Sequence, residues 1–311
     1  MKPARLYNAA EADNALGPLA EGRWLAGLRA AAGGAPYLAA LCMRYPDLAA
    51  RLNVRGPEVV VAEALAQMRA AASLPFDEAM ITMRQAKAAT HLACAVGDLS
   101  AAWSLAQVTG ALTDLADAAC ESAIALAADA LVSRGDLVAT KNHSAGPLPG
   151  LIALAMGKQG ARELNYSSDI DVTLFFDPES FPIAPDREPK VVAQRLAPLI
   201  ARALEEVTAD GYVFRTDFRL RPDPSSTPVI VSTAAAEGYY QSVGQNWERA
   251  AFIKARPCAG DIAEGEAFLQ AIARSSGAAT SITRRSPISI RSSARYSLRI
   301  KAGISMKRRL M

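Results

Sequence analysis

Histidine and cysteine are scarce in this chain. Only two histidines, His91 and His143, and four cysteines occur among its 311 residues. His91 stands among apolar residues of a predicted helix and His143 lies in a turn-rich linker, so we expect neither to be a catalytic base or a metal ligand. The cysteines have no CxxC spacing and are typical of reduced, mostly buried thiols. These absences argue against a zinc–thiolate site, a disulfide framework and a histidine-dependent catalytic triad.

Long apolar runs are also missing. The sequence has no stretch of about 20 uncharged apolar residues, the length that a membrane-spanning helix requires. Residues 1–15 lack the apolar core of a signal peptide. We therefore expect a cytoplasmic protein without a membrane partner, and the length of the chain allows two domains.

Acidic residues are absent from segment 272–311, which holds ten Lys or Arg residues. The whole chain has 34 basic and 31 acidic residues. Without this segment, the rest of the chain has 24 basic and 31 acidic residues. The remainder is therefore acidic, and a basic patch for nucleic acid would depend on the tail alone. We expect no nucleic-acid partner.

Residues 1–140 are rich in alanine and show the three- and four-residue apolar spacing of helices. We predict helices over 36–52, from Pro57, from a cap at Asp77, from a cap at Ser100 and over 112–132. No group of residues with catalytic chemistry occurs there. We interpret this region as a helical domain for packing and docking.

The apolar run 151–156 predicts a buried strand of β-type length. Gly157 and Gly160 follow it directly and allow a tight turn whose backbone comes close to a ligand. Too few residues separate these glycines from the next predicted strand for a Rossmann crossover helix. No Gly-Lys-Ser/Thr follows at the spacing of a Walker A motif.

Asp169 and Asp171 begin the next alternating segment, so both carboxylates leave a strand on the same face. Two carboxylates this close repel each other unless a cation lies between them. The pattern predicts a metal site. The alternative is a solvated strand end whose Ser167 and Ser168 make turn hydrogen bonds.

A second alternating segment, 212–221, places Asp217 on one face with Arg215, Arg219 and Arg221. Carboxylate oxygens suit Mg²⁺, and guanidinium groups suit the phosphates of a nucleotide. If the two strands are neighbours, Asp217 joins the first two acids around one or two Mg²⁺ ions. The chemistry would be in-line attack at phosphorus.

Three stretches of the chain resemble a known family, the glutamine synthetase adenylyltransferase and adenylyl-removing enzymes of the DNA polymerase β-type nucleotidyltransferase superfamily. The similarity lies in GKQGARELNYSSDID (157–171), FRTDFRLRPD (214–223) and YYQSVGQNWERAAFIKARP (239–257). It covers about residues 151–261 and is weaker over the helices before them. Gln159 and Ala161 depart from the family pattern, which has an apolar residue and a second glycine there.

The resemblance implies an α+β fold. It implies a helical domain at 1–140, a polymerase β-like nucleotidyltransferase domain with a small mixed sheet at 148–271, and an aberrant basic tail at 272–311 that we expect to be disordered. Asp169, Asp171 and Asp217 would be catalytic and would bind Mg²⁺. Residues expected to contact the nucleotide or phosphate are Gly157, Lys158, Gly160, Ser168, Arg215, Arg219 and Arg221.

The family acts on a tyrosine of glutamine synthetase, which one catalytic half adenylylates with ATP and the other frees of AMP. The helices that precede the motif resemble the N-terminal, adenylyl-removing half, in which inorganic phosphate attacks the AMP–tyrosine bond and ADP is released. The implied cofactors and substrates are Mg²⁺, ATP or ADP, and phosphate. The implied partners are glutamine synthetase and the PII signalling protein.

Two further functions stay open. One permitted set of codons for residues 275–296, read one nucleotide over, encodes a segment that looks like the continuation expected of the family. We therefore suspect a frameshift that ended a longer protein early. The chain would then be a truncated, inactive relative that only binds nucleotide or partner. A helical adaptor with a basic tail for RNA is the other alternative.

The C-terminal part of the predicted catalytic domain is mostly helical. We expect helices over 191–207, 234–243 and 247–256, and a short strand over 228–232. We expect Tyr239, Tyr240 and Trp247 in the core. Lys254 and Arg256 would contact phosphate, or else be solvated surface charges or pair with Glu248.

Overall fold

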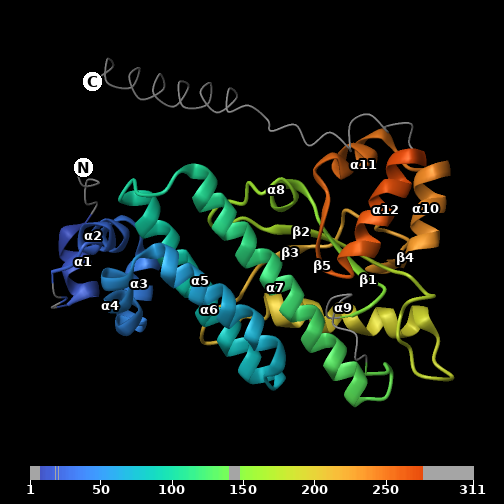
Figure 1. Cartoon of the computed structure of the whole chain (residues 1–311), viewed down its shortest axis with the longest axis horizontal. Coiled ribbons are helices and arrows are strands. Elements are labelled where there is room, and N and C mark those ends of the chain that lie inside the picture. The colour runs from blue at the N-terminus through green and yellow to red at the C-terminus, as the bar shows by residue number, and fades with distance from the viewer. Residues whose placement is uncertain (1–7, 18, 20, 140–147, 276–311) are drawn as a thin grey trace.

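One long helix, α7 (Leu105–Ser133), crosses the middle of the molecule and contacts both of its halves (Figure 1). The computed structural model describes residues 8–17, 19, 21–139 and 148–275. Helices α1–α6 lie on one side of α7, which packs against α5 and α6, and a sheet with its own helices packs on the other side (Figure 1). The α+β fold class predicted from the sequence is confirmed.

The first half is a bundle of helices. Its elements are α1 (Ala9–Leu16), α2 (Leu25–Gly34), α3 (Pro36–Arg44), α4 (Pro46–Arg55), α5 (Pro57–Ala70), the 3₁₀ turn η1 (Ala71–Ser73) and α6 (Phe76–Leu99). Three of them begin with proline, which suits the first turn because that position needs no N–H donor. The single helix predicted over 36–52 is wrong for the same reason: Pro46 ends α3 at Arg44 and starts α4.

The predicted caps at Asp77 and Ser100 are also wrong. Helix α6 begins one residue before Asp77, whose carboxylate lies in the first turn. Ser100 is the C-terminal cap of α6, and its hydroxyl donates to the Val96 carbonyl. Ser104 begins α7 instead, in a capping box with Gln107, whose backbone N–H donates to the Ser104 hydroxyl.

The sheet of the second half has five short strands in the described residues. They are β1 (Leu151–Ala155), β2 (Ile170–Phe176), β3 (Thr216–Asp217), β4 (Ile230–Ser232) and β5 (Arg256–Gly260). The order is β3-β2-β1-β5, with β4 also paired to β2. Strands β1–β2 and β1–β5 are antiparallel, whereas β3 and β4 run parallel to β2. The sheet is therefore mixed, as predicted.

Strand β2 divides two hydrophobic cores. Ile170, Val172 and Leu174 point into the core that the sheet shares with α7, α9 (Pro189–Glu205) and the bundle. Phe175 points into a second core under the C-terminal helices, where its ring centre lies 4.7 Å from that of Phe268. Because alternate residues of a strand point to opposite faces, Asp171 also leaves β2 on the second side.

The short helices complete the second half. Helix α8 (Gly157–Gly160) follows β1, and α10 (Thr233–Ser242), α11 (Asn246–Ala251), the 3₁₀ turn η3 (Phe252–Lys254) and α12 (Ile262–Ser275) cover the second core (Figure 1). The predicted helix over 247–256 is therefore wrong in its last part, because Arg256 begins β5. Proline follows it at 257, at the edge of the sheet, where a missing N–H is tolerated.

The predicted strand over 212–221 is shorter than expected. Its backbone donors are used elsewhere: the N–H groups of Val213 and Phe214 donate to the Leu204 carbonyl, at 2.9 and 3.0 Å. The N–H of Arg219 donates to a carboxylate oxygen of Asp217 at 2.8 Å. Only the two residues of β3 remain free to pair with β2.

His91 and the four cysteines are buried, as expected from the sequence. His91 is buried in α6, and its ring nitrogen Nδ1 lies 3.3 Å from the Tyr37 hydroxyl. All four cysteines are buried and unpaired. His143 and the tail from 276 lie outside the described residues, and within those residues no helix is long and apolar enough to cross a membrane.

Arg84 joins the bundle to the second half, and we predict that Arg84→Met destabilises the fold. The side chain is 1% exposed and donates to the carbonyls of Met80, Ala203, Glu206 and Gly211. Methionine keeps the volume but removes the donor from these carbonyls, two of which, those of Met80 and Ala203, accept in buried hydrogen bonds, so the free energy of unfolding should fall by about 2–4 kcal/mol.

Urea denaturation of wild type and variant measures this change. The matched control is Arg29→Met, because the Arg29 side chain is 50% exposed and its ion pair with Asp13 is a surface contact. Equal midpoints for the two variants would show that Arg84 does not hold the two halves together.

Candidate active site

Asp169 and Asp171 lie where the turn after α8 enters β2. The Ile170 N–H donates to the Arg215 carbonyl at 3.0 Å, which fixes the start of the strand. Asp169 is exposed and Asp171 is half-buried. Ser167, just before them, has a positive φ of 54°, a conformation that costs a non-glycine residue energy and holds the turn in one shape.

Asp217 lies beside Asp171 on the neighbouring strand. The two residues are direct partners in the parallel β2–β3 pair. Side chains at such positions leave the sheet on the same face. The structure therefore brings together two of the acids that the sequence places 46 residues apart, and Asp169 is next to them on the same face.

Each outer acid has a guanidinium partner. Nε of Arg215 donates to Oδ1 of Asp169 at 2.5 Å. Arg219 donates to Asp217 through Nε at 3.0 Å and through a terminal nitrogen at 2.5 Å. Asp171, between them, has no ion-pair partner in the part of the chain that the structure describes. Two of the three acids are thus paired with an arginine.

The carboxyl groups respond to these surroundings in opposite directions. Burial raises the pKa of Asp171, and the negative charges of Asp217 and Asp169 raise it further. Lys158 and Arg219 act against this rise. The hydrogen bond from Arg219 lowers the pKa of Asp217. Of these two acids, Asp171 is therefore the one whose ionised form its surroundings disfavour.

Within the described residues, no group of three or more His, Cys, Asp or Glu side chains is arranged to hold a metal ion. The donor set nevertheless fits Mg²⁺, because it consists of carboxylate oxygens. Gly157 adds space there: a Cβ at this glycine would lie 2.7 Å from Oδ2 of Asp171. A side chain on Gly157 would fill the position next to that oxygen.

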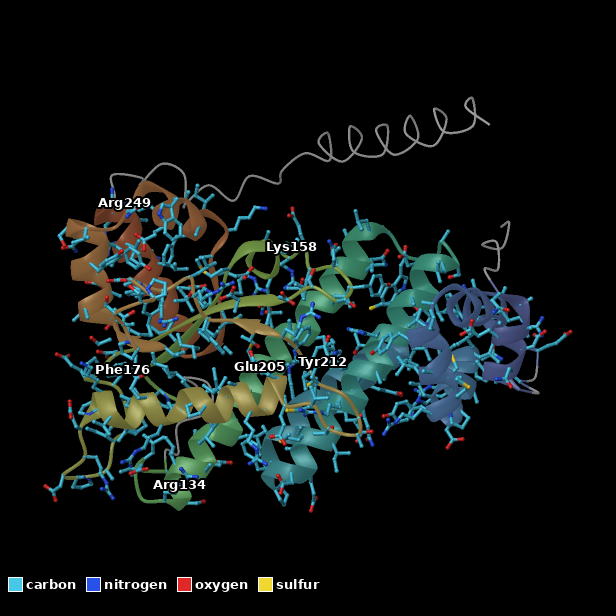
Figure 2. The ribbon with its side chains drawn as sticks, turned by 180° about the vertical axis from the view of Figure 1, so that it is seen from behind. Arg134, Lys158, Phe176, Glu205, Tyr212 and Arg249 are labelled. Atoms are coloured by element: carbon cyan, nitrogen blue, oxygen red, sulfur yellow. The ribbon has the colours of Figure 1, made fainter. Side chains whose placement is uncertain are left out.

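The other residues predicted to contact phosphate differ in their exposure and in their hydrogen bonds within the protein. Lys158 is exposed on α8 (Figure 2), and Ser168 lies half-buried in the turn. The guanidinium group of Arg221 donates to the carbonyls of Phe218, Pro224 and Thr227, and so holds the turn after β3. A phosphate contact of Arg221 stays a prediction; in this structure the side chain forms hydrogen bonds within the turn.

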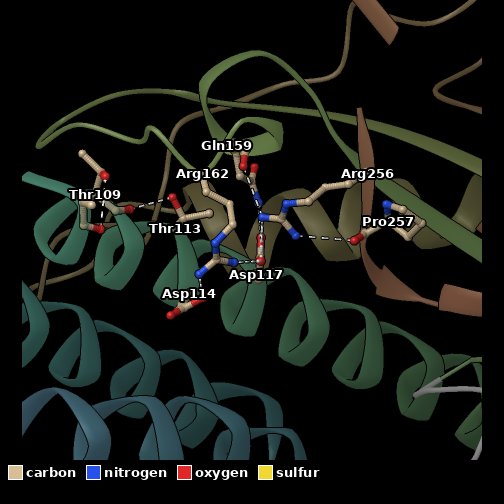
Figure 3. Close-up of polar contacts among 9 residues, drawn as sticks. Thr109, Thr113, Asp114, Asp117, Gln159, Arg162, Arg256 and Pro257 are labelled. Atoms are coloured by element: carbon tan, nitrogen blue, oxygen red, sulfur yellow. Dashed lines mark hydrogen bonds and ion pairs between the residues drawn. The ribbon is translucent and has the colours of Figure 1, made fainter. Parts of the chain in front are cut away.

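Helix α7 holds the glycine turn in place, which the sequence analysis missed (Figure 3). Asp117 of α7 accepts from Nε2 of Gln159 at 2.9 Å and forms a 2.7 Å ion pair with Arg256 of β5. Asp114 pairs with Arg162 at 2.6 Å. At Gly160 a Cβ would lie 2.1 Å from the Lys254 carbonyl oxygen, so only glycine fits this contact.

Gln159 was the signal that could have revealed this network. It stands where the family pattern has an apolar residue, and it is 1% exposed. A buried amide needs a hydrogen-bond partner. An aspartate on the alanine-rich helix 105–133 was therefore a candidate partner that the sequence already offered.

The expected pairing of Lys254 or Arg256 with Glu248 and the expected buried position of Trp247 are wrong. Lys254 pairs with Glu163 at 3.2 Å and Arg256 pairs with Asp117, whereas Glu248 accepts from the Tyr239 hydroxyl at 3.0 Å. Arg256 belongs to β5 and so points to α7 instead of along a helix toward Glu248. Trp247 is 56% exposed, not buried, whereas Tyr240 is in the core.

A family model and several curated proteins that are similar to this chain all name the same family of enzymes. A family model described as glutamate-ammonia ligase adenylyltransferase matches residues 25–271. A bifunctional glutamine synthetase adenylyltransferase/adenylyl-removing enzyme from Caulobacter vibrioides is 52% identical over 238 residues, which cover 76% of this chain and 24% of the relative. Proteins of the same name are 44% identical in Rhodopseudomonas palustris strain TIE-1 and 45% identical in Bradyrhizobium diazoefficiens. These two matches cover 79% and 76% of this chain, and 25% and 24% of the relatives, so the chain spans about a quarter of their length.

We predict that the acids of the site affect stability with opposite signs. Ionised Asp171 destabilises the fold above its raised pKa, so Asp171→Asn should increase the free energy of unfolding at pH 7. Asp217 is stabilising above the unfolded-state pKa and loses this effect as pH falls through its lowered pKa, so Asp217→Asn should reduce that free energy. Each change should be about 1 kcal/mol or less, because the groups are partly exposed.

Thermal unfolding at pH 7 and pH 3, without divalent cations, measures both effects. At pH 3 the gain from Asp171→Asn should disappear, because the wild-type carboxyl is then protonated. A loss of stability from Asp171→Asn at pH 7 would contradict the repulsion inferred among the three acids.

Proposed function

Because the chain belongs to the glutamate-ammonia ligase adenylyltransferase family, we propose that Asp169, Asp171 and Asp217 support Mg²⁺-dependent nucleotidyl or phosphoryl transfer on glutamine synthetase. The observation that carries the proposal is the direct pairing of Asp171 with Asp217 on neighbouring strands, with Asp169 close enough that its charge raises the pKa of Asp171. Guanidinium groups adjoin two of these acids. Acids for a cation and arginines for phosphate oxygens are what this chemistry requires.

The finer proposal is removal of AMP from a tyrosine of glutamine synthetase. An oxygen of inorganic phosphate attacks the phosphorus of the AMP group, and the phosphorus–oxygen bond to tyrosine breaks. The products are ADP and a tyrosine whose oxygen takes up a proton. We base this direction, over adenylylation with ATP, on the helices that precede the motif, which the resemblance assigns to the N-terminal half. A cytoplasmic location and regulation by the PII signalling protein belong to the same proposal.

The three acids would hold Mg²⁺, which supplies positive charge to the phosphate oxygens at the reacting phosphorus. Asp169 and Asp217 would exchange their guanidinium partners for the cation. Arg215 and Arg219 would then be free to bind phosphate oxygens, and Lys158 on the α8 turn is a third candidate. Gly157 leaves the space beside Asp171 that this exchange needs.

The activity test incubates AMP-modified glutamine synthetase with the chain, Mg²⁺ and phosphate, and measures ADP. We expect ADP to form with wild type and to fall by at least roughly a hundredfold in the Asp169→Asn/Asp171→Asn variant, because the cation is lost. Equal rates would exclude the acids as the site. No ADP from either protein would favour a truncated chain that only binds nucleotide or partner.

Binding of Mg²⁺ has a separate readout that needs no activity. A ligand that binds only the folded state raises its stability, so Mg²⁺ should raise the melting temperature of wild type. It should have no such effect on Asp171→Asn. The control is Asp13→Asn, which removes an exposed acid that pairs with Arg29 in the helical bundle; an equal loss of the Mg²⁺ effect there would point to non-specific screening.

A further inference from the structure

A cavity of about 460 Å³ lies between the helical bundle and the catalytic domain. Its walls come from α3, α6, the turn 164–168 and the loop 209–214. Neither the three acids nor Arg215 lines it. Alternation explains this separation: Phe214, which lines the cavity, points into the core shared with the bundle, and Arg215 points to the other face of the chain.

Lys87 of α6 brings a positive charge to this cavity. Its Nζ donates to the Tyr212 carbonyl at 2.8 Å and lies 4.0 Å from the centre of the Tyr212 ring. Tyr212 itself lies by the C-terminal end of α9, near Glu205 (Figure 2). Across the residues that the structure describes, no carboxylate forms an ion pair with Lys87. Burial, together with the charges of Arg84 and Arg215, lowers its pKa to about 8.

The other ionisable groups of the wall do not supply the missing negative charge. Asp210 is already paired with Arg44 at 2.5 Å. His91 is neutral at pH 7, because burial and Lys87 lower its pKa to about 3. Burial raises the pKa of Tyr37 to about 12, so its hydroxyl keeps its proton. The wall is therefore positive, with a hydroxyl donor nearby.

We propose that this cavity is a second ligand site, which binds a small molecule bearing a carboxylate or phosphate through the ammonium group of Lys87. The volume lies within the range of about 300–1,000 Å³ that small-molecule sites occupy. The hydroxyl of Tyr37 and the side chain of Ser168, which line the same cavity, are further polar partners. The lining rings of Tyr45 and Phe214 contact the uncharged part of the ligand.

The site is connected to the candidate catalytic acids. Tyr212 and Ser167 line the cavity, and Arg215 donates to the Tyr212 hydroxyl at 3.3 Å and to the Ser167 carbonyl at 2.9 Å. The same guanidinium group pairs with Asp169. A ligand in the cavity therefore contacts two of the groups that position Arg215.

The test is isothermal titration calorimetry of the full chain with inorganic phosphate and, separately, with malonate, at constant ionic strength. We expect one-to-one binding of at least one probe, and the two titrations distinguish a phosphate ligand from a carboxylate ligand. Lys87→Met should weaken binding by at least roughly tenfold, because the charge partner is removed. Lys87→Arg should restore it.

Three further variants make the result specific. Lys190→Met removes an exposed lysine and should bind as wild type. Asp171→Asn, which leaves the Arg215–Asp169 pair intact, should also bind as wild type, which separates this site from the proposed catalytic one. Ala40→Trp introduces a large side chain into the cavity from an exposed position of α3 and should abolish binding in a folded protein.

Three outcomes overturn the proposal. The first is the absence of heat from both probes at millimolar concentrations. The second is unchanged binding in Lys87→Met or, if that variant does not fold by circular dichroism, in Ala40→Trp. The third is loss of binding in Asp171→Asn, which would assign the ligand to the catalytic acids instead.

Discussion

The buried ion pair between Asp117 and Arg256 connects the parts of this structure on which the candidate site depends. Asp117 belongs to the long helix α7, and Arg256 begins the strand β5. Both side chains are more than four-fifths buried, so their charges attract each other with little screening by water. Gln159 donates to the same carboxylate from the glycine turn. One aspartate therefore fixes helix, sheet edge and turn relative to one another.

Strand β2 positions the acids of the site, because its two faces have different surroundings. Ile170, Val172 and Leu174 are held in the core beneath α7 and α9. The opposite face begins with Asp171 and continues with Thr173, whose hydroxyl donates to the Leu220 carbonyl at 2.9 Å. The apolar side anchors the strand, and the acidic end is thereby kept at the margin of the second core, half open to solvent.

The sequence predicted this strand and its acids well, because alternation over seven residues is a local pattern. It predicted the neighbouring strand poorly. The residues of 212–221 do alternate in polarity. However, the N–H groups of Val213 and Phe214 donate to the Leu204 carbonyl at the C-terminal end of α9, a contact that the alternation does not predict. Likewise, the partners of Arg256 and Lys87 come from residues far along the chain. Such contacts depend on tertiary packing, which periodicity and spacing do not contain.

Arg215 is the residue at which the two sites meet. Its guanidinium group holds Asp169 on one side, and the Tyr212 hydroxyl and the Ser167 carbonyl on the other. A guanidinium has a fixed planar geometry, so a shift of its acceptors on the cavity side changes its fit to Asp169. If Asp169 must release Arg215 to bind a cation, a ligand that strengthens or weakens the Tyr212 and Ser167 contacts alters that exchange. Coupling of this kind is reciprocal, so Mg²⁺ would change the affinity of the cavity by the same factor.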